Sequence, residues 1–159
     1  MDVVVDTDVL STLTKVGKTS LLHELFPKSN ILLCPSVRSE ISRAAKLGIL
    51  DSEPASFSNV ELTLSEKHAA REMRERRSLG GADVECLAVA KGRDCLLLSN
   101  DNQLGKEAIS LGVDRLSLPL LLREFWKARV LSKAEAAILA DEIEKKDRIV
   151  IKNKHLLFI

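Results

Sequence analysis

Four acidic residues stand where an apolar segment gives way to a polar one or to the start of a predicted helix: Asp6, Glu40, Asp83 and Asp101. Carboxylate oxygens are the ligands that hard divalent cations such as Mg²⁺ and Mn²⁺ take in proteins. Carboxylates that gather in one pocket raise one another's pKa values, so such a pocket either binds a cation or holds protons. The four acids therefore predict metal-assisted chemistry on a phosphate ester.

All four acids are candidate catalytic residues, with different expected roles. Mg²⁺ keeps several waters and takes only one or two carboxylates directly, which we expect to be Asp6 and Asp101. Asp83 and Glu40 would hold a water or a second ion, so Asp83 is a further candidate metal ligand. Each acid also has an ordinary structural interpretation: a turn or cap for Asp6 and Asp101, a first-turn acid for Asp83, and an ion pair with Arg43 for Glu40.

Three polar neighbours are expected to support these acids. Asp8 either adds a carboxylate to the pocket or caps the helix that follows it. The Ser99 hydroxyl would orient a bound water or Asp6, and Asn100 directly follows that serine. Glu85 faces a different side of its predicted helix from Asp83, so we expect it to be solvated or to act as an accessory ligand.

The elements that must position these residues alternate along the chain. Short apolar runs predict strands at residues 3–5, 31–33, 60–64, 95–98 and 116–118. Amphipathic stretches predict helices at residues 20–26, 36–47, 65–77, 82–91, 102–111, 119–128 and about 132–146. Continuous apolar strands separated by helices indicate an α/β fold whose parallel sheet is covered on both faces. Ligands are then expected beyond the carboxyl ends of the strands, where Asp6 and Asp101 lie.

Length and composition fit one domain over residues 1–159, in which residues 129–159 form a C-terminal helix and a tail. The formal charge of +1 excludes a uniformly basic coat, so a polyanion would need a local patch. Three cysteines in apolar surroundings suit buried thiols in a reducing cytoplasm. No signal peptide or membrane span is apparent, so we expect a cytoplasmic protein without a membrane partner.

Four short segments that carry the acids resemble, in order and rough spacing, the motifs of the PIN-domain family, and in particular its VapC-like metal-dependent ribonucleases. They read VVVDTDVL at residues 3–10, PSVRSEI at 35–41, GAD at 81–83 leading into CLAVA at 86–90, and LLSND at 97–101. The resemblance covers about residues 1–125. One position departs from it, because Asp8 stands where the family usually has asparagine, serine or another small polar residue. Ser99 fits the pattern, since threonine or serine is common there.

The resemblance implies both a fold and an activity. The fold would be a three-layer α/β/α sandwich around about five parallel strands in the order 3-2-1-4-5, which brings the ends of strands 1 and 4 side by side. The activity would be Mg²⁺- or Mn²⁺-dependent hydrolysis of RNA that leaves a 5′-phosphate. Many relatives are toxins held by small antitoxins, so an antitoxin protein is a possible partner.

Contacts with RNA and with other chains are harder to assign. Arg71, Arg74 and Arg77 are candidate RNA-binding residues, but glutamates interleave with them, and a solvated, salt-bridged helix face is the more ordinary interpretation. The tail at residues 152–159 ends in apolar residues that would be costly in water unless they dock on the body or on a second subunit. We therefore expect a homodimer.

Two other functions stay open at this point. A haloacid-dehalogenase-type phosphatase would use Asp6 as nucleophile and Asp8 as acid and base, although it would leave Glu40 and Asp83 unused. A noncatalytic RNA-binding module of the same fold is the other alternative. The sequence VGKT at residues 16–19 resembles the end of a phosphate-binding loop, but position 12 is threonine rather than glycine, which favours a helix end at Gly17.

Overall fold

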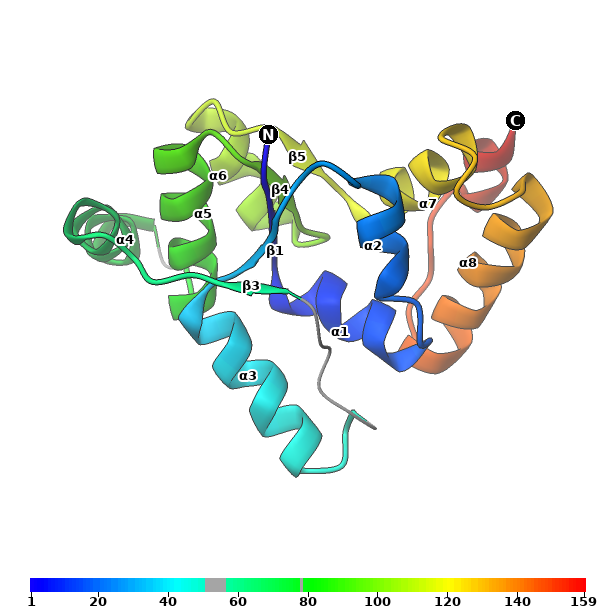
Figure 1. Cartoon of the computed structure of the whole chain (residues 1–159), viewed down its shortest axis with the longest axis horizontal. Helices are drawn as coiled ribbons and strands as arrows, with labels where there is room; N and C mark the ends of the chain where they lie inside the picture. Colours follow the sequence, from blue (N-terminus) through cyan, green and yellow to red (C-terminus); the bar gives the residue numbers. More distant parts are fainter. Residues whose placement is uncertain (51–56, 78) are drawn as a thin grey trace.

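A five-stranded parallel sheet forms the centre of the molecule in a computed structural model that describes residues 1–50, 57–77 and 79–159 (Figure 1). Its order is β3-β2-β1-β4-β5, as the resemblance implied. The strands are β1 (Val3–Val5), β2 (Ile31–Leu33), β3 (Ser58–Asn59), β4 (Leu96–Leu98) and β5 (Arg115–Leu116), and every neighbouring pair is parallel. The α/β fold with the order 3-2-1-4-5 is therefore confirmed.

Helices cover both faces of this sheet (Figure 1). They are α1 (Thr7–Lys15), α2 (Ser20–Leu25), α3 (Pro35–Lys46), α4 (Leu64–Arg77), α5 (Gly81–Arg93), α6 (Asn102–Ser110), α7 (Leu118–Lys127) and α8 (Lys133–Asp147), followed by the short 3₁₀ helix η1 (Lys154–Phe158). Helices α3, α4 and α5 lie on one side, and α2, α7 and α8 on the other. No helix among the described residues is long and apolar enough to cross a membrane.

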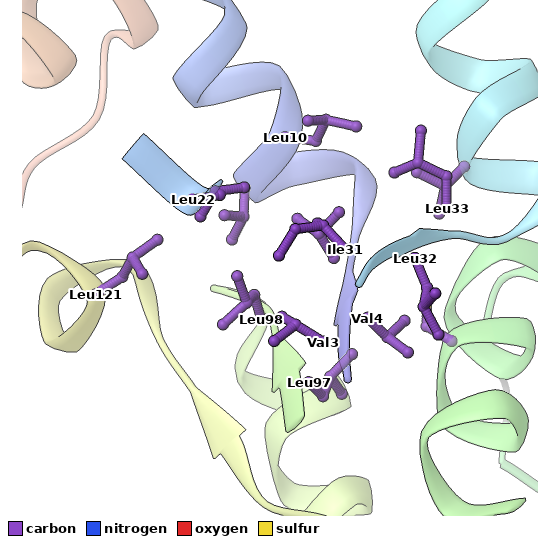
Figure 2. Packing of buried hydrophobic residues seen from close by; sticks show 14 of the residues in the cluster. Val3, Val4, Leu10, Leu22, Ile31, Leu32, Leu33, Leu97, Leu98 and Leu121 are labelled. Atoms are coloured by element: carbon purple, nitrogen blue, oxygen red, sulfur yellow. The ribbon is translucent and has the colours of Figure 1, made fainter. Parts of the chain in front are cut away.

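The two central strands are apolar throughout because both of their faces are buried. Val3 and Ile31 point toward α2 and α7, where Leu22 and Leu121 meet them, whereas Val4 points toward the side of α5 (Figure 2). Each of these side chains is at most 5% exposed. The chain consequently leaves the core only at the strand ends, which is where its polar residues can collect.

The third strand was predicted wrongly at residues 60–64. The structure pairs Ser58–Asn59 with β2, and the ladder extends only to Val60, whose N–H donates to the Leu33 carbonyl at 3.1 Å. Thr63 and Glu66 then form reciprocal side-chain to backbone hydrogen bonds of 3.1 and 3.0 Å. This capping box starts α4 at Leu64 and overrides the strand preference of the apolar residues before it.

Two other boundaries follow from local backbone chemistry. The fifth strand ends at Leu116 rather than residue 118, because α7 begins at Leu118 after the N-cap residue Ser117, and Pro119 occupies its first turn. Gly17, with φ of 66°, ends α1, and the Lys18 N–H returns to the Leu13 carbonyl at 2.9 Å. The segment that resembled a phosphate-binding loop is therefore a helix end followed by α2, as expected.

The C-terminal segment packs against the body of the domain. Helix α8 opens with the expected capping box between Ser132 and Glu135. At its other end the Asp147 carboxylate accepts hydrogen bonds of 2.5 Å from Thr12 and Lys15 of α1. The tail docks where the Trp126 indole N–H donates to the Leu157 carbonyl at 2.8 Å.

The buried face of α7 offers a direct test of this core. Leu121 is fully buried and Leu120 is 41% exposed on the same helix. We expect Leu121→Ala to lower the free energy of unfolding by about 2–5 kcal/mol, because it leaves a cavity against the sheet. Leu120→Ala should change it by less than about 1 kcal/mol. Urea unfolding measures both, and equal losses would contradict the packing described.

Candidate active site

All four sequence-predicted acids line one pocket of about 200 Å³ beyond the carboxyl ends of β1 and β4. The lining residues are Asp6, Thr7, Asp8, Glu40, Gly80, Ala82, Asp83 and Asp101. They come from segments far apart in the chain, which the strand order brings together. We refer to this cavity as the acid pocket.

Asp6 is the most buried of these acids, with 4% of its surface exposed. It follows β1 directly and caps α1, since its Oδ1 accepts a 2.9 Å hydrogen bond from the Val9 N–H. Burial raises the pKa of Asp6 to about 6, against the lowering effect of hydrogen bonds from the Ser99 hydroxyl and Val9. The carboxyl group therefore carries its charge at neutral pH in a place that disfavours charge.

Asp101 occupies the equivalent position after β4. Its Oδ1 accepts a 2.7 Å hydrogen bond from the Leu104 N–H and so caps α6. Its own N–H donates to the Ser99 hydroxyl oxygen at 3.2 Å, and the Ser99 side chain is fully buried. The structural interpretation of Asp6 and Asp101 as helix caps is thus right, and each cap engages only one carboxylate oxygen.

Asp83 lies in the first turn of α5, where its carboxylate accepts a hydrogen bond from the Gly80 N–H. Burial is the main cause that raises its pKa, and the charges of Asp101, Asp8 and Glu40 raise it further. The same mutual repulsion raises the pKa of Asp8, after burial, through Asp101. Asp83 and Asp8 therefore lie close enough to the other carboxylates for those charges to raise their pKa values.

Glu40 reaches the pocket from α3 and is held there by Thr7, whose hydroxyl donates to Glu40 Oε2 at 2.5 Å. Within the described residues Glu40 forms no ion pair with Arg43, so that interpretation was wrong. Helix α3 is in turn fixed to α5, because Glu85 Oε2 accepts a 2.8 Å hydrogen bond from the Ser36 N–H. The expectation that Glu85 is simply solvated was also wrong.

Asp8 and Asn100 differ in their positions. Asp8 lines the acid pocket but does not cap α1, a role that Asp6 takes, so the capping alternative for Asp8 was wrong. Asn100 instead lines a neighbouring pocket of about 310 Å³, which it shares with Asp8 and Asp147. Asp8 thus stands between the acid pocket and the packed end of α8.

The candidate RNA-binding arginines lie outside the acid pocket. Arg71 and Arg74 line a separate pocket of about 280 Å³ between α4 and the start of α5. The Arg77 side chain lies outside the described part of the chain. The structure therefore places the four acids and these two arginines in different pockets.

Arg115 of β5 was missed by the sequence analysis. Its guanidinium group donates to the carbonyl of Ser99 at 2.8 Å and to the carbonyl of Asp101 at 3.2 Å. It crosses α6 at Gly105, where an added Cβ would lie 2.7 Å from Arg115 Cζ. A glycine inside a predicted helix, which costs about 1 kcal/mol relative to alanine, was the only sequence signal of this close approach.

The donor set suits a hard divalent cation, since it consists of carboxylate oxygens that repel one another. Across the described ranges, no group of three His, Cys, Asp or Glu side chains is already arranged to enclose an ion. Mg²⁺ does not require such an enclosure, because it binds one or two carboxylates directly and keeps its waters. The chemistry of the pocket therefore fits Mg²⁺ or Mn²⁺.

Because its pKa is raised, Asp6 should make the free energy of unfolding depend on pH when a chelator such as EDTA keeps metal out of the pocket. The folded protein keeps the Asp6 proton up to about pH 6, whereas the unfolded chain loses it near the ordinary value of 3.8. The free energy of unfolding contributed by Asp6 should therefore fall as pH rises through this window. Asp6→Asn should gain up to about 3 kcal/mol over the wild type between pH 4 and pH 7.

Urea unfolding across this pH range measures the difference, with the exposed Asp114→Asn as the matched control. The Asn side chain can still cap α1. A constant difference between Asp6→Asn and the wild type would contradict the burial of the ionised group.

Arg115→Lys tests whether the guanidinium group holds the turn that carries Asp101. Lysine keeps the charge but cannot reach both carbonyl oxygens in the same way. We expect the free energy of unfolding to fall by about 1–3 kcal/mol, and exchange of the Leu104 amide to accelerate. Arg123→Lys is the control, since Arg123 is also partly exposed. Equal behaviour of the two variants would contradict this role.

Comparison with known proteins agrees with this geometry. A family model described as a PIN domain matches residues 2–153. No curated protein matches the chain. The matching model describes PIN domains in general. PIN domains are generally nucleases, and they typically use divalent metal ions. Because the match spans nearly the whole chain and the fold has the implied strand order, the chain belongs to the PIN-domain family.

Proposed function

We propose that this protein is an endoribonuclease that hydrolyses RNA phosphodiester bonds with Mg²⁺ or Mn²⁺ held in the acid pocket. The observation that carries the proposal is the gathering of Asp6, Glu40, Asp83 and Asp101 in one pocket of about 200 Å³. Family membership supports a nuclease rather than the haloacid-dehalogenase-type phosphatase. The unused acids of the phosphatase hypothesis, Glu40 and Asp83, lie in the same pocket as Asp6.

Asp6 and Asp101 would hold the cation, because both end a central strand and both direct a fixed carboxylate into the pocket. A bound cation supplies charge neutralisation at the phosphate oxygens and lowers the pKa of a water. Asp83, as the third candidate ligand, and Glu40 orient the attacking water by accepting its hydrogen bonds. Ser99 and Thr7 keep Asp6 and Glu40 in place through the hydroxyl contacts described.

The proposal also includes an assembly and a partner. A cytoplasmic homodimer is part of it, because Leu156 and Ile159 of the tail are 53% and 79% exposed and would be covered by a second subunit. The role of a toxin paired with an antitoxin protein is proposed from the family resemblance alone. A noncatalytic RNA-binding module is the outcome that remains if the enzyme is inactive.

Cleavage of end-labelled single-stranded RNA tests the proposal. We expect activity with Mn²⁺ or Mg²⁺, none in EDTA, and a loss of more than about a hundredfold in Asp6→Asn or Asp101→Asn, because each removes a charged ligand. The matched control is Asp114→Asn, an equal change at an exposed acid outside the pocket, which should retain activity.

A phosphomonoester is tested in parallel. Turnover of the monoester without RNA cleavage would restore the phosphatase hypothesis. RNA cleavage that persists in Asp6→Asn would point to a contaminating nuclease and contradict the proposal.

A further inference from the structure

A second pocket lies beside the acid pocket and has the opposite charge. It has a volume of about 280 Å³ and is formed by α4 and the first turns of α5 and α3. Lys67, Arg71 and Arg74 line it, together with Gly81 and Glu85. We refer to it as the basic pocket.

The three cations form one stripe along α4, at positions i, i+4 and i+7. Two of the three acids of the helix are directed elsewhere: Glu66 binds Arg93 at 2.7 Å, and Glu72 faces His68 at 3.7 Å. Across the described residues, none of the three cations forms an ion pair. The expected salt-bridged face is therefore wrong for this stripe, which leaves three exposed positive charges without a partner there.

Among the described residues that line the basic pocket, one is an acid, and it is already engaged. Glu85 Oε2 accepts the hydrogen bond from the Ser36 N–H that fixes α3 to α5. Against this single carboxylate stand the charges of Lys67, Arg71 and Arg74. The basic pocket therefore carries a net positive charge and favours an anion of about phosphate size.

Two adjacent glycines join the basic pocket to the acid pocket. Gly80 lines the acid pocket, and a Cβ added to it would lie 3.5 Å from Asp83 Oδ2. Gly81 lines the basic pocket, and a Cβ added there would lie 3.8 Å from Arg74 Nη1. Neither glycine has a side chain, so among the described residues the Gly80–Gly81 segment itself places no side chain between the pockets, and a polyanion that lies across it would reach both.

We propose that the basic pocket binds, through Lys67, Arg71 and Arg74, a phosphate of the RNA strand that flanks the phosphate held in the acid pocket. This inference rests on the proposed function, since it assigns the path of the substrate of that same site. The contact is to the backbone, and phosphate contacts position a strand without reading its sequence. The basic pocket therefore contributes affinity and register, and no base preference.

The test measures how binding of labelled single-stranded RNA depends on salt. Fluorescence anisotropy is recorded in EDTA with Asp6→Asn in every protein, which prevents cleavage. Each phosphate contact adds about 0.7 to the slope of log affinity against log salt for a single strand. The double change Arg71→Gln with Arg74→Gln removes most of the contact to this one phosphate, so it should reduce the slope by about 0.7 and weaken binding.

A matched control comes from the end of α7, which lies on the other side of the sheet from α4 (Figure 1). Lys127 and Arg129 have the same charge and are also exposed. Lys127→Gln with Arg129→Gln should leave the slope unchanged, and circular dichroism checks that both double variants are folded. An unchanged slope in the α4 variant, an equal fall in the α7 control, or no RNA binding at all would overturn the inference.

This outcome is separable from that of the proposed function. RNA cleavage by the wild type is scored independently, with Mn²⁺ present. Cleavage together with an unchanged slope overturns the basic pocket alone. A reduced slope without cleavage contradicts the nuclease and supports the basic pocket as a phosphate site.

Discussion

The burial of the Asp6 carboxylate among other acids is the interaction on which the candidate site depends. Val3–Val5 is buried on both faces, so the first polar side chain after the strand emerges directly at the sheet edge. Burial there disfavours the charged form and raises the pKa of Asp6 to about 6. Two hydrogen bonds compensate only in part, so the pocket gains from any cation that binds to it.

The order of the strands brings a second acid to the edge of the sheet where Asp6 lies. Because β4 lies beside β1, Asp101 arrives at the same edge as Asp6, and each uses one oxygen to cap the helix that follows. Each cap fixes its carboxylate through one oxygen and leaves the second oxygen outside the cap. Glu40 and Asp83 enter from helices α3 and α5, which Glu85 joins through the Ser36 N–H. The acid pocket is therefore held by the same contacts that assemble the sandwich.

Charge is distributed unevenly around this edge, although the chain carries a formal net charge of only +1. Acids crowd on one side of Gly80–Gly81, and cations of α4 gather on the other. A strand of phosphates meets attraction from the α4 cations and repulsion from the acids unless a divalent cation is bound there. The net charge is a sum over the whole chain, so it indicates neither the group of acids nor the group of cations.

The fold was predictable from sequence where burial dictates residue type. The apolar runs of β1 and β2 and the order of the acidic motifs located the sheet and the acid pocket. The third strand was misplaced because the local capping box at Thr63 and Glu66 outcompetes strand preference. A contact between polar residues far apart in the chain leaves no periodic pattern in the sequence. The hydrogen bond from Arg115 to the Asp101 carbonyl, 14 residues away, is an example. The three cations of α4 form no ion pair with the described residues, and the sequence did not indicate this because their helix contains three plausible acidic partners.

The most direct measurement is calorimetric titration of Mn²⁺ into the wild type and Asp6→Asn at pH 6 and pH 8, in buffers with different ionisation enthalpies. Metal binding releases protons from ligands that hold them. With the pKa of Asp6 at about 6, the wild type should bind Mn²⁺ and release about half a proton at pH 6 and almost none at pH 8. Absence of binding by the wild type, or identical binding and proton release in Asp6→Asn, would contradict a metal site built on this carboxylate.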